Sequence, residues 1–200
     1  MSSRHLPADE RRSVTVETVI ELAAEQNPSE ITTAAIAERM QLTQGALFRH
    51  FPTKEALWTS VMEWVADRLM ARIERAVEQA PGPLAALRAM FLAHVGFVIE
   101  HPGVPRMMFG ELQRAQASAP KRMAQALIRR YGERVRALLE AGQQAGEVAH
   151  GIDLDAAATL FVGTIQGLVM QSLLADDHGH IDRQAPAVLE LYLRAIRSGS

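Results

Sequence analysis

The chain contains no cysteine, which excludes disulfide bonds, thiolate metal sites and thiol-based redox sensing. It also lacks a large excess of either charge, because its formal net charge is −2 at pH 7. No internal repeat or low-complexity tract is present. No apolar run approaches the roughly 18 to 20 residues needed to cross a bilayer, and Met1 to Pro7 lacks the apolar core of a signal peptide. We therefore expect a cytoplasmic protein with no membrane association.

Catalytic motifs are absent as well. We find no nucleophile with a base, no phosphate-binding loop and no zinc signature. One Glu-x-x-His spacing of the kind used in di-metal helical bundles exists, Glu147 with His150, but it lies between Gly146 and Gly151, where a helix is disfavoured. His178-Gly179-His180 lies in a polar loop. We expect no catalytic residues, no cofactor and no metal site, and a helical-bundle metalloenzyme is the least favoured alternative.

Helical periodicity accounts for most of the chain. Asn27-Pro28-Ser29 ends a first helix, expected from about Glu10 to Glu25. Its apolar residues recur at the spacing that puts one stripe on a helix, namely Val16, Val19, Ile20, Ala23 and Ala24. No strand alternation extends over a useful length. Further helices are expected from residue 57 to the break at 81–83, and over residues 83–100, 104–113, 120–145, 153–175 and 184–197. We predict an all-α fold.

Two short helices joined by a tight turn follow the first helix. Thr32 is placed to cap the second helix, and good helix formers come directly behind it. Gln41-Leu42 make the turn, and Thr43 can accept a backbone N–H of the next helix. That third helix runs from Gln44 to His50, before Phe51-Pro52 stops it. Two helices joined by so short a turn indicate a helix-turn-helix.

The third helix divides into an anchored face and an outer face. Leu47 and Phe51 are four residues apart, so both can pack on one side of the helix. The outer face then carries Gln44, Gly45, Phe48 and Arg49. A recognition helix needs this division, because its N-terminal residues must reach base edges in the major groove of DNA.

Positive charge is concentrated locally. Acidic residues outnumber basic ones over residues 1–60, so the region is not basic as a whole. Between Glu38 and Glu55, however, no acidic residue occurs. Basic side chains in this window are Arg39, Arg49, His50 and Lys54. The charge therefore lies where a phosphate backbone would pass.

This stretch resembles the helix-turn-helix of the TetR family of bacterial transcriptional regulators. The matching residues are Thr32-Thr33, Ile36-Ala37, Thr43-Gln44-Gly45, Leu47-Phe48, His50-Phe51 and Lys54-Glu55-Ala56-Leu57. Three positions depart from the family pattern. Gln41 occupies a turn position often filled by glycine, Ala46 a position often hydroxylated, and Phe48 the position of the usual tyrosine.

The resemblance implies roles for individual residues. Positions matching Gln44 and Gly45 approach base edges in the family, and those matching Thr33, Phe48, His50 and Lys54 touch phosphates. Gln44 has the donor and acceptor for a bidentate adenine contact, Gly45 allows close backbone approach, and Lys54 adds charge to a helix start that favours anions. The predicted DNA-binding residues are Thr33, Thr43, Gln44, Gly45, Phe48, Arg49, His50 and Lys54.

A long helix joins the helix-turn-helix to the rest of the chain. Its apolar residues repeat every four positions, from Leu57 to Val77, so the stripe drifts around the helix and contacts different partners along its length. It ends at Pro81-Gly82-Pro83. We predict an N-terminal three-helix DNA-binding domain over residues 1–56 and a C-terminal helical effector-binding and dimerisation domain over residues 57–200.

The last two helices predict a homodimer. The helix over residues 153–175 is apolar on nearly every side and must be covered all round. The final helix has two apolar faces, which a monomer of this size rarely hides, and the resemblance also implies dimerisation. Two-fold symmetry would pair two recognition helices with a palindromic operator. The predicted interface residues are Leu160, Gly163, Gly167, Met170, Leu174, Val188, Leu189, Tyr192 and Ile196.

The middle helices predict an effector pocket. Methionines and aromatic residues with few polar groups line pockets for organic ligands, although most such residues are core in other proteins. His94, Tyr131 or Gln166 would orient an apolar effector. The predicted pocket residues are Met90, His94, Phe97, Met108, Met123, Leu127, Tyr131, Phe161, Gln166 and Met170.

These features together predict a DNA-binding transcriptional regulator. We expect a repressor that binds double-stranded operator DNA as a dimer. A small, largely apolar effector would release it by tilting the long helix. The alternative is a DNA-binding structural or partner-recruiting protein of the same fold without a small-molecule switch. Release of DNA by a ligand would favour the regulator, and constitutive binding at many genomic sites would favour the alternative.

Overall fold

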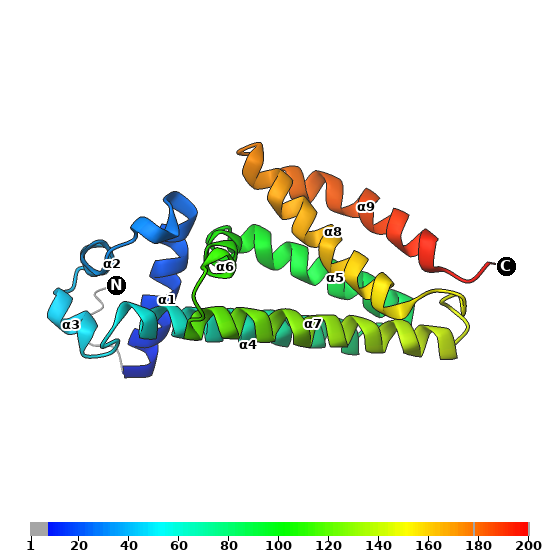
Figure 1. The fold of residues 1–200 in the computed structure, drawn as a ribbon, viewed down its shortest axis with the longest axis horizontal. Helices are drawn as coiled ribbons and strands as arrows, with labels where there is room; N and C mark the ends of the chain where they lie inside the picture. Colours follow the sequence, from blue (N-terminus) through cyan, green and yellow to red (C-terminus); the bar gives the residue numbers. More distant parts are fainter. Residues whose placement is uncertain (1–7, 178, 200) are drawn as a thin grey trace. The chain divides into compact units, whose positions relative to one another are not determined.

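A computed structural model describes residues 8–177 and 179–199. Over these ranges it contains no strand, only an isolated antiparallel bridge between Val148 and Arg197, and the predicted all-α fold is confirmed (Figure 1). The elements are α1 (Ala8–Glu25), η2 (Pro28–Glu30), α2 (Thr33–Arg39), α3 (Gln44–Phe48), α4 (Lys54–Glu78), α5 (Pro83–Glu100), α6 (Gly103–Gln113), α7 (Ala119–Gln144), α8 (Leu154–Leu174) and α9 (His180–Ile196).

The chain divides into two compact units that differ from the predicted domains. The first contains the chain up to Arg68 together with His101–Leu127, and the second contains Leu69–Glu100 and the chain from Ile128 onward. Both α4 and α7 therefore contribute residues to each unit. A functional boundary between residues 56 and 57 stays a prediction, since packing groups α6 and the first half of α4 with the helix-turn-helix.

In the first unit, the short helices begin where the sequence predicts. Thr32 caps α2 by accepting the backbone N–H of Ala35 at 3.1 Å, and Thr43 caps α3 by accepting that of Ala46 at 3.2 Å. Such caps satisfy backbone donors that a helix start leaves unpaired. The core of this unit is formed by fully buried apolar side chains, among them Val19, Ile31, Ile36, Leu47, Phe51, Leu57 and Val61.

Helix α6 packs directly on α1, a contact that the sequence did not predict. Gly103, the first residue of α6, makes the close approach possible. A Cβ atom there would lie 1.9 Å from the backbone oxygen of Ile20 and 2.9 Å from the backbone nitrogen of Ala24. Because Gly103 has no side chain, the start of α6 can pack directly against the backbone of α1.

The turn between α2 and α3 places Gln41 in the left-handed region of backbone conformation, with φ of 55°. The N–H of Gln41 donates to the carbonyl of Glu38 at 2.9 Å, and the N–H of Leu42 donates to that of Ala37 at 2.8 Å. This bond pair defines a Schellman motif, in which glycine is the usual residue at the Gln41 position. The turn therefore forms although its left-handed position holds a glutamine, whose backbone is strained there.

We expect Gln41→Gly to stabilise the protein by about 1 kcal/mol, because glycine adopts positive φ without the steric cost that other residues bear. Thermal denaturation would measure the gain. Gln41→Ala is the matched control, since alanine also lacks the glutamine side chain but keeps the strain. Equal melting temperatures for the glycine and alanine variants would contradict the strain argument.

In the second unit, α9 packs on both α5 and α8 (Figure 1). Asp153 caps α8 by accepting the N–H groups of Asp155 and Ala156. Helix α9 begins at His180, about one turn before the predicted start. The carboxylate of Asp177 accepts the N–H of Gly179 and pairs with Arg183 on the first turn of α9. This local pairing stabilises a helix start that the polar sequence had indicated as a loop.

Two helices qualify as membrane spans by length and composition, which corrects the expectation that none would. They are α5 and α8, with mean hydropathy of 1.4 and 1.5 over their most apolar windows. Each packs part of its surface inside the second unit, through buried residues such as Leu87 and Phe91 on α5 and Phe161 and Ile165 on α8. Core helices of soluble proteins have the same composition, so the two helices are weak evidence for a membrane.

Candidate functional site

Helix α3 presents the predicted recognition face to solvent. Leu47 and Phe51 are both 2% exposed and anchor the helix to the core. Gln44, Gly45 and Arg49 are exposed, and Phe48 is 42% exposed. Apart from its chain neighbours and the backbone of α3 itself, no atom of the described residues lies within 4 Å of where a Gly45 Cβ would stand. The start of α3 can therefore approach a flat or grooved surface closely.

Two arginines of α1 lie beside the predicted phosphate-contacting residue His50. Arg11 contributes an Nη1 atom 3.3 Å from His50 Nε2. Because guanidinium only donates, Nε2 accepts, which leaves Nδ1 of His50 as the donor for an outside group. Arg12 donates to the backbone oxygen of His50 at 3.2 Å and lies 4.9 Å from the Phe51 ring centre. The sequence analysis missed this pair, and the Arg-Arg dipeptide was its available signal.

Arg39 contributes less positive charge than its position in the sequence suggested. Its guanidinium makes a two-pronged pair with the Glu25 carboxylate, at 3.1 Å and 2.5 Å. The hydrogen bonds that Arg39 donates to Glu25 raise the pKa of Arg39 and lower the pKa of Glu25. The basic side chains left for a phosphate backbone in this region are those of Arg12, Arg49, His50 and Lys54.

Lys54 lies at the start of α4, as predicted. Its Nζ atom lies 4.8 Å from the ring centre of Trp58 and donates to the backbone oxygen of Ser29 at 3.4 Å. Burial lowers the pKa of Lys54, and the charge of Arg114 lowers it further. Of the other predicted contacts, Thr33 is half-buried and Thr43 is exposed with its hydroxyl used as a helix cap.

The ten predicted pocket residues do not share one unit. Met108, Met123 and Leu127 belong to the first unit, whereas the other seven belong to the second. Within the second unit, Gln166 is exposed on α8 and Met170 is 37% exposed. Gln166 contributes with Gly163 to the lining of a surface groove between α7 and α8. In the second unit, Met90, Phe97, Tyr131 and Phe161 are buried. His94 is half-buried as a residue, with its Nδ1 atom buried.

An aromatic cluster connects the inner faces of α5, α7, α8 and α9. The ring centres of His94 and Tyr131 are 5.1 Å apart, and Tyr131 is 6.3 Å from Phe161. Phe161 also contacts Phe91 at 5.5 Å and Tyr192 at 5.3 Å, both edge to face. The structure thus brings together three predicted pocket residues, His94, Tyr131 and Phe161, that come from three different helices.

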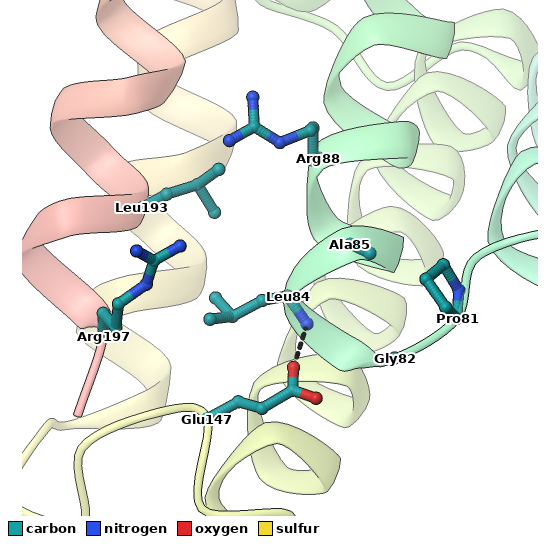
Figure 2. A pocket seen from close by; sticks show the side chains of 8 residues that line it. All are labelled: Pro81, Gly82, Leu84, Ala85, Arg88, Glu147, Leu193 and Arg197. Carbon is teal, nitrogen blue, oxygen red and sulfur yellow. Dashed lines mark hydrogen bonds between the residues drawn. The ribbon is translucent and has the colours of Figure 1, made fainter. Parts of the chain in front are cut away.

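A separate pocket of about 400 Å³ lies near the end of α9 in the second unit. Figure 2 shows Arg88, Leu193, Arg197 and Glu147 around it. Two of its charged groups have partners within the chain. Glu147 accepts the N–H of Leu84 at 2.8 Å, and Arg88 pairs with Glu190. Arg197 also contributes to the lining.

Glu147 caps the start of α5 through Leu84 rather than facing His150 as a paired ligand. Over the described residues, no group of three or more His, Cys, Asp or Glu side chains is arranged to hold a metal ion. His178 lies outside the described residues.

The predicted interface residues divide between core and surface. Leu189, Tyr192 and Ile196 are buried inside the chain, and the Tyr192 hydroxyl donates to the backbone oxygen of Ala157 at 3.0 Å. These three side chains are engaged within one protomer, so we remove them from the expected interface. Leu191, which the sequence analysis did not select, is 61% exposed on α9.

The exposed face of α8 retains the other interface residues in a regular pattern. Leu160 is 56% exposed and Leu174 is 80% exposed. Gly163 and Gly167 have open space where a Cβ would stand. Together with Met170 these residues alternate three and four positions apart, the spacing of a seam between helices. Val188 on α9 is half-buried.

Comparison with known families identifies both halves of the chain. Residues 16–61 match the model of bacterial regulatory proteins of the tetR family, and residues 111–188 match that of the tetracyclin repressor-like C-terminal domain. The nucleoid occlusion factor SlmA of Vibrio vulnificus is 32% identical over 89 residues, which span 44% of this chain and 45% of that protein. The match thus covers less than half the length of that curated relative.

Solved structures share the fold over nearly the whole chain. The ketosteroid transcriptional regulator KstR2 of Mycobacterium tuberculosis superposes with a TM-score of 0.79 at 19% identity, covering all of both chains. The transcriptional regulator FadR of Bacillus subtilis, in complex with stearoyl-CoA, has the same TM-score and identity, covering 92% of this chain and 98% of that one. At such identities the similarity establishes the fold.

Proposed function

We propose that this chain, which belongs to the TetR family of bacterial regulatory proteins, is a transcriptional repressor. It would be cytoplasmic and would bind DNA. In this proposal a homodimer binds a palindromic operator, and a small, largely apolar effector releases it. The family and its structural neighbours are regulators and not enzymes. The observation that carries the proposal is the solvent-facing start of α3, where Gln44 and Gly45 stand beside four basic side chains.

The proposed DNA contact is supported by the geometry of the first unit. A recognition helix inserts its N-terminal residues into the major groove, and flanking groups contact the backbone on either side. Gln44 can read adenine through its amide, while Arg49, His50, Lys54 and Arg12 can meet phosphates. Phe48 lacks a hydroxyl and would contribute apolar contact instead.

Dimerisation would use the exposed faces of α8 and α9. A stripe of Leu160, Gly163, Gly167, Met170 and Leu174 leaves apolar area in water, which a second copy would cover. The glycines would allow helices to approach closely. Two-fold symmetry then spaces the two recognition helices by about one turn of DNA, about 34 to 36 Å.

The switch would act through elements that belong to both units. Because α4 and α7 each contribute residues to both units, an effector that favours one position of these helices would also favour one spacing of the recognition helices. By linkage, the effector and the operator then weaken each other's binding by the same factor. FadR of Bacillus subtilis was solved with stearoyl-CoA, which is an example of a ligand held by this fold.

The named relatives favour a second candidate function. The relative SlmA, which is 32% identical over 89 residues, is a nucleoid occlusion factor, so this chain could instead mark DNA and recruit a partner without a small-molecule switch. Binding at many genomic sites that no apolar compound releases would support this second function.

Gln44→Ala is expected to weaken binding to the operator by about 5- to 150-fold, from the roughly 1–3 kcal/mol of one bidentate base contact. The affinity for unrelated DNA should be the same for Gln44→Ala and the natural protein. Fluorescence anisotropy with DNA from upstream of its own gene, at two salt concentrations, would measure both affinities.

Lys54→Gln is the matched control for that measurement. It should weaken binding to both DNAs alike and reduce the salt slope by about 0.9, because Lys54 would meet a phosphate. If Gln44→Ala lost affinity equally for both DNAs, base reading by Gln44 would be disproved.

A further inference from the structure

Two buried polar atoms in the aromatic cluster have no hydrogen-bond partner within the described part of the chain. They are Nδ1 of His94 on α5 and the hydroxyl of Tyr131 on α7. Their ring centres are 5.1 Å apart and the rings are tilted by 60°, so the two side chains are direct neighbours. Tyr131 is only 3% exposed. Burying polar groups without partners destabilises a fold, and such groups in native proteins commonly serve a function.

Tyr192 shows what a structural tyrosine in the same cluster looks like. It contacts the same Phe161 ring, at 5.3 Å, and is 5% exposed. Its hydroxyl, however, donates to the backbone oxygen of Ala157 at 3.0 Å. The chain has two tyrosines, and the fold satisfies the hydroxyl of Tyr192 but not that of Tyr131. General packing of aromatic residues therefore does not explain the Tyr131 hydroxyl.

The pair carries no charge at neutral pH. Burial lowers the pKa of His94 to about 4, and burial raises the pKa of Tyr131 well above its usual value. The neighbouring ring on Tyr131 is that of Phe161, and Phe161 in turn contacts Phe91 and Tyr192, so these aromatic neighbours are uncharged. Tyr131 offers an O–H donor, and Nδ1 of His94 donates or accepts according to the imidazole tautomer. A carboxylate or phosphate placed here would lose its hydration without gaining a cation.

We propose that His94 and Tyr131 together bind one uncharged polar group, a hydroxyl or a ketone, at the end of an otherwise apolar effector. Tyr131 donates to the oxygen of that group, and His94 completes its second hydrogen bond. The aromatic rings and Met90 cover the adjoining hydrocarbon. This inference rests on the proposed function, since it assigns the chemistry of the effector, and it selects neutral compounds over acyl-CoA thioesters and free fatty acids.

Three probes of equal chain length test the head group directly: 1-decanol, 2-decanone and decanoate. Each is titrated into the full-length protein without DNA, and binding is followed by isothermal calorimetry. The two neutral probes should bind at least tenfold more tightly than decanoate. Tyr131→Phe should weaken binding of 1-decanol by about five- to tenfold, the worth of one hydrogen bond. Tyr192→Phe, the matched control, should change that affinity less than twofold.

Thermal denaturation without any probe supplies a second readout. Tyr131→Phe should raise the melting temperature, because it removes an unsatisfied hydroxyl, whereas Tyr192→Phe should lower it. Equal or tighter binding of decanoate, unchanged 1-decanol affinity in Tyr131→Phe, or no binding of either neutral probe would each overturn the proposal. So would destabilisation by Tyr131→Phe equal to that by Tyr192→Phe. Because DNA is absent, failure of the proposed regulatory function would be seen separately, in a DNA-release assay with the same probes.

Discussion

Replacing Gly103 by alanine is expected to destabilise the first unit by about 3 kcal/mol or more. A Cβ at this position would lie 1.9 Å from the Ile20 oxygen and 3.0 Å from the Ile20 carbonyl carbon. Both are backbone atoms of α1, so no side-chain rotation relieves the clash, and α1 and α6 must separate. Overpacking usually costs 1–3 kcal/mol when side chains can adjust, and this site lacks that freedom. Thermal denaturation would show the loss.

DNA affinity should fall with it near the melting temperature, because α1 is part of the core on which α2 and α3 pack. Gly110→Ala is the control, since it lies in the same helix with nothing within 4 Å of the new Cβ. That variant should be stabilised by about 0.5–1 kcal/mol, from the higher helix propensity of alanine. Similar melting temperatures for Gly103→Ala and the natural protein would contradict the close approach of α1 and α6.

If the proposed dimer forms through α8 and α9, Leu191→Glu is expected to convert it into a monomer. Leu191 is 61% exposed on α9 and Leu160 is 56% exposed on α8, and a carboxylate buried between two copies would be unpaired. Light scattering should give about twice 22.0 kDa for the natural protein and 22.0 kDa for Leu191→Glu. Operator affinity should fall by about 10²- to 10⁴-fold, since each half-site would then be bound independently.

Leu92→Glu provides the matched control for this prediction. Leu92 is 44% exposed on α5, outside the proposed α8 and α9 faces, so the same change should leave the mass and the operator affinity unaltered. A Leu191→Glu protein that remains dimeric, or a Leu92→Glu protein that dissociates, would place the interface elsewhere.

Local signals in the sequence predicted the helix-turn-helix well. Thr32 and Thr43 cap their helices because a hydroxyl next to good helix formers satisfies backbone donors nearby in the chain. The predicted start of α9 was wrong because the contact that stabilises it is not a signal of local helix propensity. The pairing of Asp177 with Arg183 spans a loop whose composition favours no helix by itself.

Long-range packing could not be predicted from one sequence. Gly103 follows a proline and so indicates a turn, and nothing near it in the chain reveals that Ile20 lies against it. Periodicity identified two apolar faces on the last helix, and both carry residues that are buried within the chain, such as Tyr192 and Leu189. Leu191 belongs to neither face, so it was not expected to be exposed apolar surface. The meeting of His94 with Tyr131 depends on the packing of separate helices, although both were among the candidates.

The packing of α6 against α1 also determines which segment must be transferred if the helix-turn-helix is exchanged with that of a relative. A chimera joined directly after the helix-turn-helix would lack α6, which packs on α1 through Gly103. The transferred segment would then expose the face of α1 that α6 covers. Stability of the helix-turn-helix therefore depends on two stretches that are distant in sequence. A working graft would have to carry residues 101–127 together with residues 1–68.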